Sequence, residues 1–259
     1  MQVDLNNKVA LVTGAARGIG QAIADEFGRN GATVFYADID EETARVAAES
    51  GSGKSLRMNV TDESEVNSGI ARIVEECGHL DILVNNAGVN TLHKRVNINE
   101  FSTDEWRRVM EVDLNGLFFA SRAGASAMLG GGGGRIINIA SVVGLVPLRL
   151  QCAFAAAKAG VVNLTKAMAL ELGSQNILVN GIAPGSVLTD ATRALFYSPD
   201  GSFNHAVQQL MDHIPLARPG TAQEIAHAAL FLAAPESSYI NGHILTVDGG
   251  WTAGYSRDF

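Results

Sequence analysis

The chain has 259 residues and a net charge of −8 at pH 7, with 47% hydrophobic and 18% charged residues. This composition is typical of a compact domain with a large core and excludes a disordered chain. An acidic surface repels phosphate backbones, so we expect no nucleic acid partner. Cys77 and Cys152 lie far apart in the sequence, which fits a reducing compartment.

The N-terminal residues carry neither a basic stretch nor an apolar one, and no apolar run in the sequence is long enough to cross a bilayer. We therefore expect a cytoplasmic protein without a membrane partner. We expect no metal site.

Short apolar stretches alternate with helical stretches along the chain. The expected strands are at 9–13, 33–37, 55–58, 82–84, 135–139, 177–182 and 243–247. Most are apolar on both sides, as in a parallel sheet that is covered on two faces. The alternation predicts βαβ units in one α/β domain that spans residues 1–259.

The expected helices lie between these strands. They cover 18–30, 41–50, 62–77, 104–128 and 152–172, and a last one runs from 221 toward 234. Ser102 with Glu105 and Thr221 with Glu224 have the spacing of capping boxes. The segment 189–214 breaks the rhythm, and an insertion there predicts a lid over the substrate.

The first strand leads into a turn that contains Gly14, Gly18 and Gly20 and then into a helix. Glycines permit a tight turn and a close backbone approach to a pyrophosphate, and the helix N-terminus offers N–H groups to the phosphates. The pattern therefore predicts a dinucleotide site.

Asp38 ends the second expected strand, where a carboxylate would accept hydrogen bonds from the adenosine ribose hydroxyls and repel a 2′-phosphate. Arg17 would instead favour NADP, since a guanidinium near that position could pair with the 2′-phosphate. We expect the carboxylate to dominate and the cofactor to be NAD. The alternative role for Asp38 is a helix N-cap or turn residue, for which Asp40 is a rival.

The chain resembles the short-chain dehydrogenases/reductases over nearly its whole length. The resemblance rests on the ordered motifs Thr13-Gly14-x-x-x-Gly18-Ile19-Gly20, Asn85-Asn86-Ala87-Gly88, Asn115, Ser141, Lys158, Pro184-Gly185 and Val247-Asp248-Gly249-Gly250. It implies a Rossmann-like, doubly wound parallel sheet of about seven strands with helices on both faces. It also implies NAD(P) binding and a homotetramer or dimer, in which helices 104–128 and 152–172 form an interface.

The resemblance assigns cofactor contacts by position. The predicted set is Gly14, Arg17, Gly18, Ile19, Gly20, Asp38, Asn59, Val60, Asn86, Ala87, Gly88, Lys158, Pro184, Gly185, Val187 and Thr189. Asn59 and Val60 would contact the adenine, and Lys158 the nicotinamide ribose.

The same resemblance implies catalytic roles for Asn115, Ser141 and Lys158, and it places Phe154 where the family has a tyrosine. A tyrosine four residues before a lysine shares its helix face, and the ammonium lowers the pKa of the phenol for proton transfer. A phenyl ring cannot donate or accept a proton. Lys158 is surrounded by small apolar residues, where a lysine without a partner would be costly.

Phe154 has three competing explanations. It is a deliberate change made to trap a complex, a natural variant that uses Ser141, water or a substrate group for the proton, or the mark of a non-catalytic protein.

Substrate contacts are expected from Ser141, Arg149 and Gln151, among apolar neighbours. Such a mixed lining suits a polyol, sugar or hydroxy acid better than a steroid or a long acyl chain. The sequence thus predicts an NAD-dependent oxidoreductase that interconverts a secondary alcohol and a ketone on a small polar substrate. The alternative is an NAD-binding regulatory or redox-sensing protein without turnover.

Overall fold

A seven-stranded parallel sheet forms the centre of the chain in the computed structural model, which describes residues 2–91, 95–189 and 211–254. The strand order is β3-β2-β1-β4-β5-β6-β9. The strands are β1 (Val9–Thr13), β2 (Thr33–Asp38), β3 (Lys54–Arg57), β4 (Ile82–Asn85), β5 (Gly134–Ile139), β6 (Ile177–Pro184) and β9 (Ile244–Val247). The doubly wound sheet predicted from the sequence is confirmed, and the strand order reverses direction between β1 and β4.

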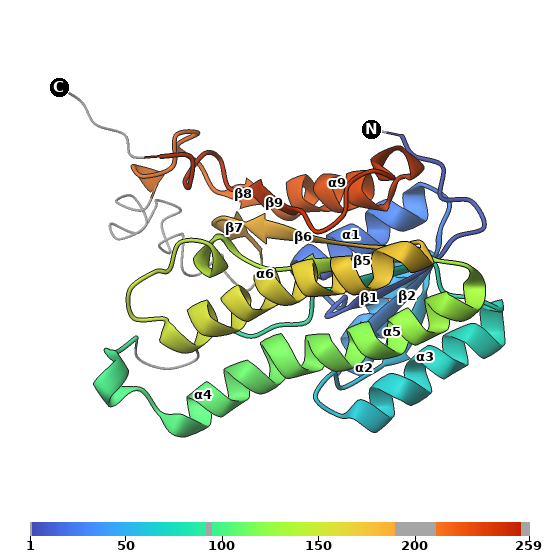
Figure 1. Cartoon of the computed structure of the whole chain (residues 1–259), viewed down its shortest axis with the longest axis horizontal. Helices are drawn as coiled ribbons and strands as arrows, with labels where there is room; N and C mark the ends of the chain where they lie inside the picture. The colour runs from blue at the N-terminus through green and yellow to red at the C-terminus, as the bar shows by residue number, and fades with distance from the viewer. Residues whose placement is uncertain (1, 92–94, 190–210, 255–259) are drawn as a thin grey trace.

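Helices cover both faces of this sheet. They are α1 (Gly18–Arg29), α2 (Glu41–Ser50), α3 (Glu63–Cys77), α4 (Thr103–Met110), α5 (Leu117–Gly131), α6 (Cys152–Leu172) and α9 (Ala222–Ala233). Helices α1 and α9 pack on one face, and α3, α5 and α6 pack on the other (Figure 1). Successive strand residues face opposite ways, so Ala10 and Val12 join the first core while Val9 and Leu11 join the second.

One expectation about the helices needs correction. The single helix expected at 104–128 is α4 and α5 joined by a π-helical segment, Glu111–Gly116. Such wide turns occur often at functional sites. The capping box expected at Thr221 and Glu224 is confirmed, with Thr221 as the N-cap of α9.

A small parallel ribbon flanks the segment that was expected to form a lid. Here β7 (Val187–Leu188) pairs with β8 (Gly220–Thr221). Most of the predicted lid at 189–214 lies outside the described residues, although Met211 and Ile214 are buried.

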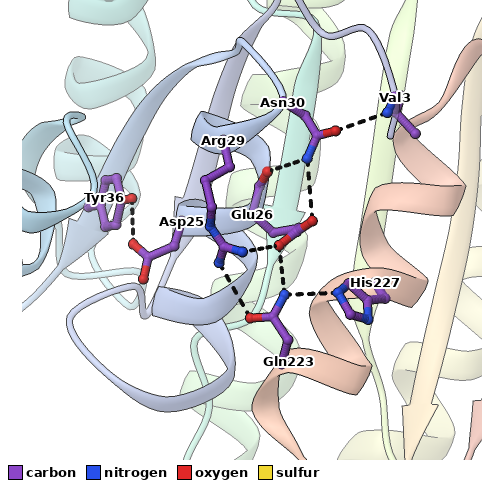
Figure 2. A network of polar contacts seen from close by, with 8 residues as sticks. All are labelled: Val3, Asp25, Glu26, Arg29, Asn30, Tyr36, Gln223 and His227. Atoms are coloured by element: carbon purple, nitrogen blue, oxygen red, sulfur yellow. Dashed lines mark hydrogen bonds and ion pairs between the residues drawn. The ribbon is translucent and has the colours of Figure 1, made fainter. Parts of the chain in front are cut away.

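A polar network joins α1 to α9 around the buried carboxylate of Glu26 (Figure 2). Glu26 lies 2.6 Å from Arg29 Nη1 and accepts a 2.6 Å hydrogen bond from Gln223 Nε2. Asn30 also donates to it, and the Asn30 side chain accepts the Val3 amide. These partners offset the cost of burying a carboxylate. Within the described ranges, no helix has both the length and the apolar character that a bilayer span requires.

Candidate active site

The turn between β1 and α1 has the close-packed backbone that a phosphate cradle requires. Gly14 and Gly18 have φ angles of 64° and 63°, a region that favours glycine. A methyl group on Gly20 would lie 2.2 Å from Gly14 O and 2.4 Å from Asn86 Nδ2. Asn86 Nδ2 donates to Thr13 O at 3.0 Å and to Gly14 O at 2.9 Å, so the β4 loop holds this turn in shape.

Helix α1 begins directly after this turn, with Ile19 in its first turn. Its N-cap residue is Arg17, whose side chain makes no capping hydrogen bond. The backbone N–H groups of a first helical turn have no partners inside the helix, and a phosphate can accept from them. The turn therefore fits the diphosphate of a dinucleotide.

Asp38 lies against the glycine turn at the carboxyl end of β2. Its carboxylate accepts from the Ala16 amide at 3.2 Å and from the Asp40 amide at 3.0 Å. The N-cap of α2 is Asp40, which accepts from Thr43 N at 3.2 Å, so the helix-capping alternative for Asp38 is wrong, whereas the bond from the Asp40 amide bears out its turn alternative. Arg17 Nη2 lies 3.9 Å from Asp40 Oδ2, and its charge is thus partly matched.

The remaining predicted cofactor residues follow the carboxyl ends of neighbouring strands. Asn59 and Val60 follow β3, and Asn86, Ala87 and Gly88 follow β4; Pro184 ends β6, and Gly185, Val187 and Thr189 come after it. The amides of Asn86 and Ala87 each donate to Thr13 Oγ1 at 3.1 Å. Thr189 Cγ2 lies 3.5 Å from where a Cβ on Gly18 would be. The structure thus brings the ends of β1, β4 and β6 together at the edge where doubly wound sheets bind ligands.

Lys158 is a buried cation on α6, with a relative exposure of 5%. Its Nζ donates to the carbonyl of Ile139 at 3.1 Å and lies 3.2 Å from Asp113 Oδ2. The ammonium also lies 5.7 Å from the centre of the Phe154 ring. Lys158 therefore has a charged partner, and Phe154 keeps the predicted position beside it.

The partner, Asp113, was not among the residues predicted from the sequence. It lies in the π-helical segment with a relative exposure of 1%, and its Oδ1 accepts the Val89 amide at 2.7 Å. A methyl on Gly88 would lie 3.3 Å from Asp113 Oδ2 and 3.4 Å from Lys158 Nζ. Glu111 and Asn115 beside it in the sequence are also polar, so no signal in the sequence singled out Asp113.

The structure does not bring Asn115 to Lys158. Asn115 is exposed, and its Nδ2 donates to Glu111 Oε2 at 2.7 Å. Residues two apart on a helix point in different directions, so only one of Asp113 and Asn115 can reach α6. The position beside Lys158 is 113, and the catalytic assignment of Asn115 lacks this structural support.

Ser141 lies at the carboxyl end of β5, two residues after the carbonyl that binds Lys158. Its Oγ accepts the Val143 amide at 3.2 Å. A Cβ on Gly144 would lie 2.6 Å from the Lys158 carbonyl, so the turn after Ser141 packs directly on α6. Ser141, Phe154 and Lys158 therefore lie at the same end of the sheet.

The two other predicted substrate residues differ in exposure. Arg149 is exposed, whereas Gln151 is buried at the start of α6. Leu150 between them has a φ of 66°, an unusual conformation for a residue with a side chain. Among the residues that the structure covers, no group of three metal-ligand side chains comes together.

The chain is similar to several known proteins over most of its length. A family model described as enoyl-(acyl carrier protein) reductase matches residues 14–252. The trans-4-hydroxycyclohexanecarboxylate dehydrogenase of Sinomonas cyclohexanicum is 42% identical over 258 residues, covering 95% of this chain and 93% of that protein.

Two further similarities extend over the whole fold. The 3-oxoacyl-[acyl-carrier-protein] reductase FabG of Escherichia coli K12 is 40% identical over 250 residues, which is 96% of this chain and 98% of that protein. The crystal structure of gox2181 superposes with a TM-score of 0.91 at 32% identity, covering 97% of this chain and 98% of that one.

Proposed function

Since the chain belongs to the short-chain dehydrogenase/reductase family, we propose that it is an NAD-dependent oxidoreductase acting on a small polar substrate. The reaction class, interconversion of an alcohol and a ketone, follows from its relatives. The choice of NAD and the class of substrate rest on particular residues. The observation that carries the proposal is the convergence of the glycine turn, Ser141 and Lys158 at one edge of the sheet.

Asp38 supports NAD over NADP. Its carboxylate lies against the turn that would hold the diphosphate, and two backbone amides fix its position. A 2′-phosphate placed there would meet a negative charge at short range. Arg17, the residue that could offset this repulsion, already lies near Asp40.

A small hydroxy acid, polyol or sugar is the substrate class that we propose. One relative is named for a cyclic hydroxy acid, while the FabG proteins are named for a 3-oxoacyl group on an acyl carrier protein. The exposed guanidinium of Arg149 supports the first of these chemistries, because it can pair with a substrate carboxylate.

Residues of the chain would have separate roles in the reaction. The Ser141 hydroxyl bonds the reacting oxygen, and the Lys158 ammonium binds the nicotinamide ribose. The bound cofactor supplies the site that accepts or gives the hydride. Phe154 leaves proton transfer to Ser141, water or a substrate group, and loss of a general acid/base costs about 10²–10⁴ in rate.

A turnover assay tests this function. NADH formation, followed by absorbance, is measured on a panel of hydroxy acids, polyols and sugars for the wild-type chain and for Phe154→Tyr. Phe231→Tyr on α9, half-exposed on the other face of the sheet, is the matched control. We expect slow turnover in the wild type and in the control, and a gain of about 10²–10⁴ in Phe154→Tyr.

The alternative function is cofactor binding without turnover, which Phe154 favours. NADH binding combined with no turnover in wild type and in Phe154→Tyr, on every substrate, would establish it. Absence of NADH binding would exclude both functions.

We also propose that the chain forms a homodimer or tetramer through α5 and α6. Phe118 and Leu129 on α5 and Leu170 on α6 are exposed apolar side chains, at 42%, 47% and 87%. Light scattering after gel filtration tests this, and a monomer at micromolar concentration would contradict it.

A further inference from the structure

The most unusual feature of the site is a carboxylate that neutralises the buried lysine. Asp113 and Lys158 are 1% and 5% exposed, and their charged atoms lie 3.2 Å apart. We propose that Asp113 is a positioning residue that cancels the charge of Lys158 at the nicotinamide end of the cofactor site. It thereby allows the oxidised cofactor to bind about as readily as the reduced one. This inference rests on the proposed function.

Asp113 is fixed on two sides. Its Oδ1 accepts the Val89 amide at 2.7 Å, and its Oδ2 faces Lys158. Lys158 is directed from the other side by the Ile139 carbonyl at 3.1 Å. The pair therefore connects the end of β4, the end of β5 and helix α6.

Because Gly88 has no side chain, Asp113 and Lys158 lie close to the backbone of the predicted cofactor loop. Even a methyl group there would lie 3.3 Å from Asp113 Oδ2 and 3.4 Å from Lys158 Nζ. Asn86, Ala87 and Gly88 are predicted cofactor contacts. The pair thus borders the surface on which the nicotinamide half of the cofactor would rest.

The two redox forms of the cofactor differ in one charge. The oxidised nicotinamide ring carries a positive charge and the reduced ring is neutral, so a lone ammonium nearby weakens binding of the oxidised form alone. A carboxylate beside the ammonium removes this bias. The nearby cation Arg108 is itself paired with Glu105 at 2.9 Å, so it adds little to the net charge beside the Asp113–Lys158 pair.

A double-mutant cycle on the two charged residues tests the proposal. It measures cofactor affinity and does not depend on turnover. Dissociation constants for the oxidised and reduced forms of NAD are measured by calorimetry for the wild type, Asp113→Asn, Lys158→Met and the double variant. Thermal unfolding of each variant checks that it is folded. If Asp113→Asn does not fold, Asp113→Ser replaces it, since its hydroxyl also offers an acceptor to Val89.

We expect the two single variants to shift the ratio of the dissociation constants of oxidised and reduced NAD in opposite directions. Asp113→Asn weakens oxidised NAD relative to reduced by about tenfold, the size of a partly screened charge interaction over a few ångströms. Lys158→Met shifts the ratio in the other direction while weakening both forms. The double variant, which has no charge on either residue, returns to within about threefold of the wild-type ratio.

A merely structural role for Asp113 would change both constants together. A ratio that stays constant across the four proteins, with reduced NAD still bound, overturns the inference and leaves the proposed function standing. Failure of the wild type to bind either form of NAD or NADP overturns both. If NADP binds more tightly than NAD, the same ratio is measured with that pair, and the same shifts are required.

Discussion

Replacing Gly20 by alanine should damage the turn that is proposed to hold the cofactor diphosphate. The new methyl would lie 2.2 Å from the carbonyl oxygen of Gly14 and 2.4 Å from Asn86 Nδ2, well inside van der Waals contact. The closest atom belongs to the backbone, so relief requires movement of the turn itself. Overpacking of this kind costs about 1–3 kcal/mol, and we expect the upper end, about 3 kcal/mol.

Thermal unfolding and NADH titration measure the two consequences. For a chain of this size, 3 kcal/mol lowers Tm by about 6–12 °C. NADH affinity should fall at least about tenfold, because the displaced turn no longer presents its N–H groups.

Gly130→Ala in α5 is the control, since a Cβ there has nothing within 4 Å. It should be neutral or stabilising by about 0.5–1 kcal/mol. Equal Tm and equal NADH affinity for the two alanine variants would refute the packing that we describe.

Three further outcomes follow from single contacts. Asp38→Ala should shift the ratio of kcat/KM for NAD over NADP toward NADP by about tenfold or more, and an unchanged ratio would remove the argument for NAD. Glu26→Ala should cost about 2–3 kcal/mol in urea unfolding, because Gln223 and Arg29 lose a buried acceptor; a change below about 0.5 kcal/mol would contradict the network. Hydrogen bonds from Arg218, and next from the Thr221 amide, lower the pKa of Glu224 from 4.5 to about 2. Its stabilisation is therefore complete above pH 4.5 and is lost as the pH falls toward 2, so Glu224→Gln should flatten the pH dependence of unfolding in that window and leave its slope above pH 5 unchanged.

The sheet and the glycine turn could be predicted because their signals are local. A buried parallel strand has a short apolar sequence, as in β1. The glycines that follow β1 mark a tight turn, in which Gly14 and Gly18 have positive φ angles. The positions of Ser141 and Lys158 could be inferred from the order of motifs along the chain. Both lie where the carboxyl ends of β4 and β5 meet α6.

Asp113 could not be found in this way, because its role depends on the π-helical turn between α4 and α5. A regular helical period cannot show which of Asp113 and Asn115 faces α6, and the family motif favoured the asparagine. In the structure Asn115 is exposed and Asp113 is buried, so Asp113 is the residue that faces α6. The β7–β8 ribbon escaped prediction for a similar reason, since two-residue strands carry no periodic pattern.

We propose that Ser141 and Lys158 form a nicotinamide oxidoreductase site that lacks the hydroxyl group of a tyrosine at position 154. The most direct test is the single-turnover rate of NADH formation by Phe154→Tyr, with saturating NAD and the best hydroxy acid of the panel, against the wild type. We expect a rate at least about 10²-fold above that of the wild type. No NADH from a folded Phe154→Tyr variant that binds the cofactor would contradict it.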